Sequence, residues 1–247
     1  MQTESKTAPC TSRIATSNRN GLPTGNGEEN ALVAKPYRSS TNANTFKQFA
    51  EYVGVSVDFL RSLPISARAD RIEFNFDNGA VKCRNMSKKK AFFWRTPEGS
   101  HDPDLWPDPT QQLPNVIWLT EGETDCVVAR NAGLEAYALT KGMGAVLGKE
   151  AIRDLHRRGA QTVVLALDTD EPGKNSIPKH FTALRSTGMK VSICDLPQIV
   201  RGAEKDIRDV WLRMESDTEG FRHMLDDAVV GPEHDNIEAQ DIPTNVD

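Results

Sequence analysis

The stretch from Val116 to Asp125 reads Val-Ile-Trp-Leu-Thr-Glu-Gly-Glu-Thr-Asp, and it decides how the rest of the chain is interpreted. Its first four residues are apolar and rich in β-branched and aromatic side chains. The sequence then becomes polar at once and reaches Gly122. A short apolar run that ends in this way is typical of a buried strand that leads into a turn. The stretch therefore predicts a strand with Glu121 just beyond its carboxyl end.

The same pattern recurs twice further along the chain. Residues 162–167 form a second apolar run, which is followed by Asp168 and Asp170. A weaker run at residues 191–194 is followed, after a loop, by Asp206. Each of the three predicted strands therefore has a carboxylate at or after its carboxyl end.

These carboxylates form a candidate metal site, because ligands of open α/β sheets bind at the carboxyl ends of the parallel strands. Residues two apart in an extended chain share one face, so Asp168 and Asp170 can line one crevice. Mg²⁺ prefers oxygen ligands and keeps coordination positions free for substrate phosphates. The sequence therefore predicts a site for Mg²⁺ or Mn²⁺ made of Glu121, Asp168, Asp170 and Asp206.

Helical segments separate the predicted strands. Strands that alternate with helices at this spacing form parallel βαβ units with right-handed crossovers. We therefore predict the α/β class, with a doubly wound parallel sheet over residues 113–214 and a further helix over residues 215–230. The helix after the second strand is expected to begin late, with Ser176 as its N-cap, because Pro178 is tolerated only in a first turn.

The segments outside this sheet differ from it in composition. Residues 1–41 are rich in Ser, Thr, Asn, Gly and Pro, which predicts a disordered leader. Residues 42–112 predict a small basic α+β subdomain followed by a proline-rich connector. Residues 231–247 hold five acids and no Lys or Arg, which predicts a disordered acidic tail. The expected elements of the small subdomain are helices at 46–53 and 57–63 and strands at 71–76, 81–84 and 91–94.

Residues 82–95 form a basic segment in a chain whose net charge is −5. It contains no acidic residue, and it could be a solvated hairpin edge, where lysines discourage aggregation. The alternative is a surface that contacts phosphates. Its basic residues are Lys82, Arg84, Lys88, Lys89, Lys90 and Arg95.

Composition excludes several classes of protein. The negative net charge argues against a protein that coats nucleic acid generically. The four cysteines are far apart in the sequence, so neither a zinc ribbon nor a disulfide framework is expected. The sequence has no run of 18 apolar residues and no secretory signal, so we expect no membrane contact and a cytoplasmic location.

Four motifs together resemble the Toprim domain that primases share with topoisomerases and some nucleases. The variant found here is most similar to phage-type primase–helicases and their organellar relatives. The upstream hairpin, the basic segment and Phe93-Trp94 resemble the basic subdomain that precedes Toprim in those primases. The motifs are Thr-Glu-Gly-Glu-Thr-Asp at 120–125, Lys-Gly-Met-Gly at 141–144, Asp-Thr-Asp-Glu-Pro-Gly-Lys at 168–174 and Lys-Asp at 205–206.

The resemblance assigns roles to single residues. It implies that Glu121 is a general acid/base or lies beside the metal, that Asp168 and Asp170 are the metal-binding pair, and that Asp206 is the last acid of the family pattern. The first three would be the catalytic residues. Accessory acids of the primase branch correspond to Glu123 and Asp125, and nucleotide or nucleic-acid contacts to Lys82, Arg84, Lys88, Lys89, Lys90, Lys141 and Lys174.

Some of these acids also have a purely structural interpretation. Asp206 could cap the helix that starts there, and Asp170 could shape the turn before a Pro-Gly pair. Glu123 and Asp125 could be favourable charges at a helix N-terminus. Glu121 at a strand end is the hardest to explain in this way.

The function implied is that of a metal-dependent DNA primase, which makes short primers on single-stranded DNA from nucleoside triphosphates. A Toprim-type nuclease would use the same acids with water as the nucleophile. A non-catalytic replication module that docks a separate helicase is a third possibility. The sequence shows no zinc ribbon and no helicase motor, so template selection and unwinding would need a partner, such as a separate replicative helicase. A phage or plasmid origin would place the protein in the cytoplasm of the host cell.

Overall fold

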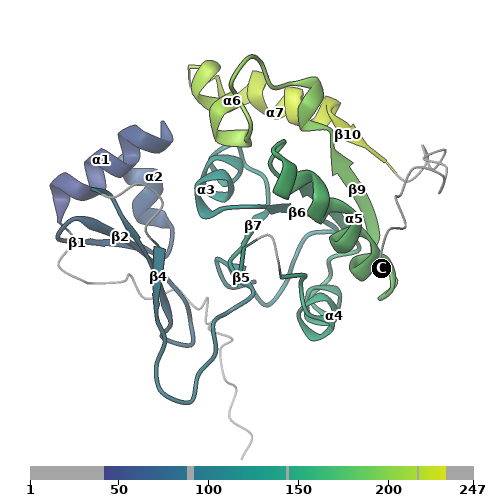
Figure 1. Cartoon of the computed structure of the whole chain (residues 1–247), viewed down its shortest axis with the longest axis horizontal. Coiled ribbons are helices and arrows are strands. Elements are labelled where there is room, and N and C mark those ends of the chain that lie inside the picture. The colour runs from purple at the N-terminus through teal and green to yellow at the C-terminus, as the bar shows by residue number, and fades with distance from the viewer. Residues whose placement is uncertain (1–41, 88–91, 143–144, 216, 232–247) are drawn as a thin grey trace, which may run out of the picture. The chain divides into compact units, whose positions relative to one another are not determined.

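The computed structural model describes residues 42–87, 92–142, 145–215 and 217–231 (Figure 1). The predicted leader, residues 232–247 of the predicted tail, and Lys88 to Lys90 lie outside these ranges. All of the described residues fall within one compact unit, which contains a four-stranded and a six-stranded sheet. No described helix is long and apolar enough to cross a membrane.

The smaller sheet is antiparallel, in the order β1-β2-β3-β4, and helix α1 packs on it. Asn42 caps this helix, and Gly54 ends it in the left-handed conformation with φ 76°. The predicted helices and three of the strands are present, while β1 has no counterpart in the sequence prediction because its four residues show no clear alternation. The elements are α1 (Ala43–Val53), α2 (Val57–Ser62), β1 (Ile65–Arg68), β2 (Arg71–Asn75), β3 (Val81–Asn85) and β4 (Phe92–Arg95).

The larger sheet has the order β10-β9-β8-β6-β7-β5, and its four central strands are parallel. The predicted α/β class is therefore confirmed. The strands and helices are β5 (Leu105–Trp106), β6 (Val116–Thr120), α3 (Glu123–Asn131), β7 (Ala136–Leu139), α4 (Lys149–Arg157), β8 (Thr162–Ala166), α5 (Glu171–Arg185), β9 (Lys190–Cys194), η1 (Leu196–Gln198), α6 (Ile207–Arg213), α7 (Thr218–Asp227) and β10 (Val229–Val230).

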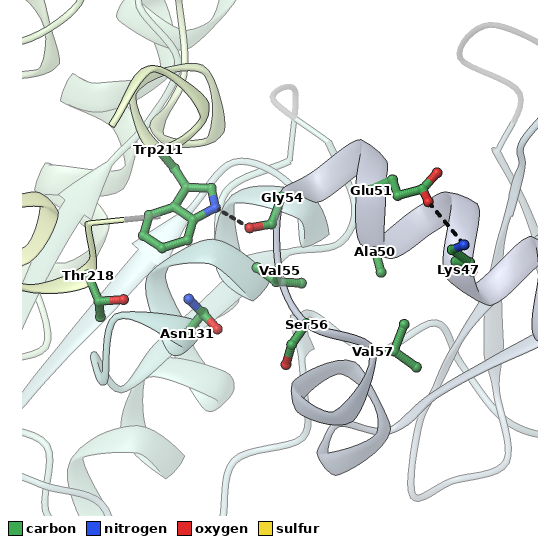
Figure 2. Close-up of a pocket in the computed structure, with 10 residues that line it drawn as sticks. All are labelled: Lys47, Ala50, Glu51, Gly54, Val55, Ser56, Val57, Asn131, Trp211 and Thr218. Carbon is green, nitrogen blue, oxygen red and sulfur yellow. Dashed lines mark hydrogen bonds and ion pairs between the residues drawn. The ribbon is translucent and has the colours of Figure 1, made fainter. Parts of the chain in front are cut away.

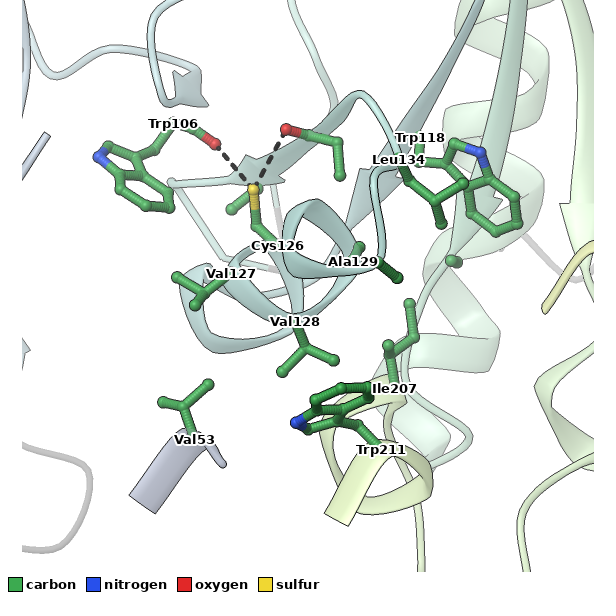
Figure 3. Packing of buried hydrophobic residues seen from close by; sticks show 14 of the residues in the cluster. Val53, Trp106, Trp118, Cys126, Val127, Val128, Ala129, Leu134, Ile207 and Trp211 are labelled. Carbon is green, nitrogen blue, oxygen red and sulfur yellow. Dashed lines mark hydrogen bonds between the residues drawn. The ribbon is translucent and has the colours of Figure 1, made fainter. Parts of the chain in front are cut away.

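Helices cover both faces of this sheet. Ile117 and Leu119 of β6 belong to a buried cluster with residues of α4 and α5. Trp118, which points to the opposite face, belongs to a second cluster with residues of α3 and α6 (Figure 3). This alternation along one strand is the pattern of a doubly wound sheet.

Both edges of the larger sheet end in short antiparallel strands. One of them, β5, lies in the proline-rich segment that was expected to be a connector. Trp106 of β5 is fully buried, and its ring centroid lies 5.0 Å from that of Phe74 in the smaller sheet. The Cys126 thiol of α3 donates to the Trp106 carbonyl at 3.5 Å, a contact drawn as a dashed line in Figure 3. The segment therefore packs the two sheets together, which a two-residue strand could not reveal by periodicity.

The expected start of α5 at Ser176 is wrong. The helix begins at Glu171, with Asp170 as its N-cap, and Pro178 lies inside it. Asp170 Oδ1 accepts a hydrogen bond from Gly173 N–H at 3.1 Å, which supplies a strong start signal. An internal proline costs about 3 kcal/mol by removing one hydrogen bond, and burial of one face of α5 against the sheet offsets this cost.

A contact between α6 and the end of α1 also joins the two sheets. Trp211 Nε1 donates to the carbonyl of Gly54 at 2.9 Å (Figure 2). A pocket of about 540 Å³ lies beside this contact, and its lining contains none of the strand-end acids.

Candidate metal centre

The carboxyl ends of β6 and β8 bring Glu121, Asp168 and Asp170 together. The two strands are parallel neighbours in which Thr120 pairs with Ala166, so the residues that follow emerge at the same edge. One oxygen from each of the three carboxylates lies within 4.8 Å of the others. In addition, the backbone N–H of Asp168 donates to Glu121 Oε2 at 3.3 Å.

A second group of acids shares Asp168 with the first. It consists of Asp125, Asp168 and Asp206, whose ligand oxygens again lie within 4.8 Å of one another. Asp125 and Asp206 are only 5% and 6% exposed. The structure therefore places Asp206 with Asp125 and not with Glu121, and it moves Asp125 from an accessory position into the centre.

The helix-cap interpretations and the acid groups coexist. Asp206 Oδ1 accepts from Asp209 N–H at 2.8 Å at the start of α6, and Asp170 caps α5. A carboxylate has two oxygens, so one can cap a helix while the other faces a cation. Helix caps thus fix the orientation of two of the clustered acids.

Gly173 sets the distance between the start of α5 and the end of β8. A Cβ atom built at this position would lie 2.1 Å from the carbonyl oxygen of Asp168. Such a contact is far inside van der Waals distance, and the atom it meets is backbone that cannot rotate away. The glycine of the Asp-Thr-Asp-Glu-Pro-Gly motif is therefore required for Asp168 and Asp170 to hold their positions.

Replacing Gly173 with alanine is therefore expected to destabilise the protein, although alanine normally favours a helix over glycine. Overpacking of this kind costs about 1–3 kcal/mol, which lowers the Tm by roughly 2–12 °C in a domain of this size. Affinity for Mn²⁺ should fall as well. Gly148→Ala, before α4, is the matched control, because its Cβ would meet only Asp104 Oδ2 at 3.6 Å. Equal melting of the two variants would show that Gly173 is not a packing constraint.

The negative charges of the acids in the centre are only partly balanced by positively charged neighbours. Burial, followed by the neighbouring charges of Asp168 and Asp170, raises the pKa of Glu121 to about 7. Burial and the charge of Asp206 raise the pKa of Asp125 well above its usual range. Burial also raises the pKa of Asp168, although the hydrogen bond from Lys205 opposes this effect. A bound cation would relieve each of these costs.

The raised pKa of Glu121 predicts a pH-dependent cost in the metal-free protein. The folded state holds the proton more tightly than the unfolded chain between pH 4.5 and about 7, so stability falls as pH rises through that window. Glu121→Gln should therefore raise the Tm at pH 8, in the presence of EDTA, and change it little at pH 5. Allowing for partial exposure, we expect roughly 1–2 kcal/mol at pH 8.

The control for this measurement is Glu171→Gln, which removes an exposed acid from the same edge of the sheet. It should change the Tm little, because an exposed carboxylate is solvated by water. A Glu121→Gln variant that also behaves in this way would mean that Glu121 carries no extra proton near neutral pH.

Lys205 also belongs to the centre. It is part of the Lys-Asp motif at 205–206, but no role was predicted for it from the sequence. Its Nζ lies 3.0 Å from Asp168 Oδ2 and 3.9 Å from Asp170 Oδ2. Thr169 N–H donates to the carbonyl of Lys205 at 2.8 Å, which fastens this loop to the end of β8. Burial lowers the pKa of Lys205, but the hydrogen bond that it donates to Asp168 and the charges of the surrounding acids outweigh this effect and raise the pKa to about 12. The lysine is therefore the internal countercharge of the acids.

The donor set fits a hard divalent cation. Both groups offer only carboxylate oxygens, which suit Mg²⁺ and Mn²⁺ and not the soft metals that prefer thiolates. The described cysteines, Cys83, Cys126 and Cys194, are buried and belong to neither group. The coarse prediction of a divalent-metal site thus agrees with the residues that the fold brings together.

The predicted phosphate-contacting residues lie in different surroundings. Lys82 is 12% exposed, and its Nζ pairs with Glu123 Oε1 at 2.5 Å and donates to the Thr140 carbonyl at 3.0 Å. Lys141 pairs with Asp104 at 2.5 Å and is 42% exposed. Lys174 is exposed on the first turns of α5. Lys82 thus faces inward, and Glu123, its partner, lies outside both acid groups.

Residues 118–211 match the model of the Toprim-like family. The chain contains a Toprim-like domain. The matched residues run from β6 to α6 and include both acid groups and Lys205, so the recognition made from the four motifs is confirmed. No curated protein matches the chain at a significant level.

Solved structures of primases are similar to this chain in fold. The primase fragment of the bacteriophage T7 primase-helicase protein superposes with a TM-score of 0.51 at 18% identity, over 72% of this chain and 71% of that one. The Aquifex aeolicus primase, solved as its zinc-binding and RNA polymerase domains, gives 0.56 at 12% identity, over 73% of this chain and 55% of that one. A complex of the T7 lagging-strand DNA polymerase with two gp4 primase domains, an RNA/DNA hybrid and dTTP gives 0.51 at 18% identity, over 71% and 88%. At these identities the likeness concerns the fold alone.

Proposed function

We propose that the chain is a metal-dependent nucleotidyl transferase of primase type, which makes short primers on single-stranded DNA. The observation that carries this proposal is the presence of two clusters of three acids that have Asp168 in common. Within each cluster, the ligand oxygens lie within 4.8 Å of one another. Two adjoining cation positions suit phosphoryl transfer, where catalysis depends on positioning and charge neutralisation. Cations bound there would activate the primer 3′-hydroxyl and stabilise the leaving pyrophosphate.

The chain's own residues would have separate roles in this reaction. Asp168 would serve both groups, while Asp170 and Glu121 would complete one of them and Asp125 and Asp206 the other. Glu121 could hold or release a proton near neutral pH, because its pKa is about 7. Lys205 would help to neutralise charge at the centre.

Template and partners are part of the same proposal. The T7 match is a primase fragment of a primase-helicase protein, which supports a replicative helicase as a partner for this chain. Single-stranded DNA would approach the centre from the side of the smaller sheet. Nucleoside triphosphates would be the second substrate.

The test is incubation with single-stranded DNA, labelled nucleotides and Mg²⁺ or Mn²⁺, with synthesis and cleavage scored in one gel. We expect oligonucleotides a few residues long that depend on both metal and template. Shortening of the DNA without synthesis would replace the proposal by a Toprim-type nuclease. Neither synthesis nor cleavage, with retained binding to a replicative helicase, would indicate a docking module.

A further inference from the structure

Two arginines from distant segments converge on the hydroxyl of Tyr52. Arg84 of β3 donates through Nη2 to Tyr52 Oη at 2.8 Å, and Arg208 of α6 donates to the same oxygen through Nη1. Each guanidinium carbon lies 4.7 Å from the centroid of the Tyr52 ring. Tyr52 itself is 38% exposed, so this cluster is open to solvent.

The cluster has capacity to bind an anion. Arg84 makes no ion pair with any carboxylate in the part of the chain that the structure describes. Arg208 contacts Asp209 Oδ1 at 3.0 Å and Asp206 Oδ2 at 3.7 Å, but its buried Nε has no hydrogen-bond partner among the described residues. Arg208 thus has carboxylate neighbours and Arg84 has none among the described residues, so an added anion would lower the repulsion between the two guanidiniums. The arrangement therefore favours an anion with several oxygen acceptors.

The cluster also borders the second acid group of the metal centre. The backbone N–H of Arg208 donates to Asp125 Oδ1 at 3.2 Å, and the Arg208 side chain lies beside Asp206. A cation bound to Asp125 and Asp206 would neutralise the charge that now balances Arg208. Metal binding would thus leave the two arginines with an excess of positive charge that an anion could satisfy.

We propose that Arg84, Tyr52 and Arg208 form a phosphate-binding site for the polyphosphate chain of a nucleoside triphosphate. This inference rests on the proposed function, and it adds Tyr52 and Arg208 to Arg84, which the family resemblance alone suggested. A polyphosphate carries charge on successive phosphates, so it can contact bound cations at one end and the arginines at the other. Arginine suits this role because its planar fork binds phosphate oxygens in pairs.

The test uses inorganic tripolyphosphate with Mg²⁺, a probe that has neither base nor sugar, and measures its Kd by calorimetry. Arg84→Met and Arg208→Met should each weaken binding by about tenfold or more, as expected for a lost charge-assisted hydrogen bond. Tyr52→Phe should give a smaller loss. The matched control is Arg61→Met, which removes an exposed arginine paired with Asp58 on α2 and should bind like the wild type.

Two further measurements complete the design. Affinity for Mn²⁺ alone should be unchanged in Arg84→Met, which shows that the metal centre is intact. If Arg208→Met fails to fold, Arg84→Met and Tyr52→Phe carry the test, because Arg84 and Tyr52 are side chains at the surface. Binding of oligo-dT without metal should also stay within about twofold of the wild type in these variants, since one arginine is a small part of a phosphate-contacting surface.

The possible results distinguish a failure of the proposed phosphate-binding site from a failure of the proposed primase activity. Wild-type affinity for tripolyphosphate in both arginine variants would overturn the inference, even if the protein synthesises primers. Loss of oligo-dT binding with unchanged tripolyphosphate binding would also overturn it, and would assign the arginines to template phosphates. Weakened tripolyphosphate binding in a protein that makes no oligonucleotides would support the site and remove the proposed function.

Discussion

Replacing Asp168 and Asp170 together with asparagine is expected to abolish nucleotide incorporation, while the metal-free protein stays at least as stable as the wild type. Both acid groups lose Asp168, so neither can hold a cation tightly, and the loss of electrostatic stabilisation should reduce the rate by on the order of 10³-fold or more. Stability should not fall, because the change removes repulsion between neighbouring carboxylates. Asparagine at 170 can still cap α5, and Lys205, which is 43% exposed, can be solvated.

The measurement is incorporation on single-stranded DNA together with the Tm in EDTA and in Mn²⁺. Mn²⁺ should raise the Tm of the wild type and not that of the double variant, since a ligand stabilises only a state that binds it. Asp217→Asn is the matched control, because Asp217 caps α7 by accepting from Gly220 N–H and belongs to neither acid group. Full incorporation by the double variant would exclude the proposed metal centre. A large fall in its Tm would show that the two aspartates serve mainly to stabilise the fold.

Lys82→Met is expected to cause the largest loss of stability. Glu123 is almost fully buried, with 4% of its side chain exposed, and its ion pair with Lys82 crosses from the smaller sheet to α3. Breaking a buried pair by removing one partner costs about 3–5 kcal/mol, because the other charge stays buried. For a domain of this size, that corresponds to a fall in Tm of roughly 6–20 °C.

The second half of this experiment is the double variant Lys82→Met with Glu123→Gln. Removing the orphaned charge should restore more than half of the lost stability, as judged by denaturant unfolding. Lys47→Met serves as the control, since Lys47 pairs with Glu51 on the exposed face of α1, where both side chains are about two-thirds exposed; such pairs contribute at most about 1 kcal/mol. If Lys82→Met unfolds no more easily than Lys47→Met, the lysine is free to contact phosphates, as the sequence suggested.

The sequence by itself determined which residues stand at the strand ends. Glu121 and Asp168 were predicted there because a buried strand and the turn after it are local patterns within a few residues of chain. The end of the first predicted helix at residue 53 is also a local pattern, because Gly54 stops the helix by adopting a left-handed backbone conformation. The α/β class followed from the alternation of such segments.

Only the tertiary structure decided which acids share a site. Asp125, Asp168 and Asp206 come from three separate segments, and their grouping depends on the order of the strands and on how α3 and α6 pack, which no local pattern specifies. The inward position of Lys82 and the contact of Arg84 and Arg208 with Tyr52 likewise depend on the smaller sheet lying against the larger one. A charged side chain that the sequence predicts to be exposed can be buried when the fold brings a partner of opposite charge to it, because pairing offsets the cost of desolvation.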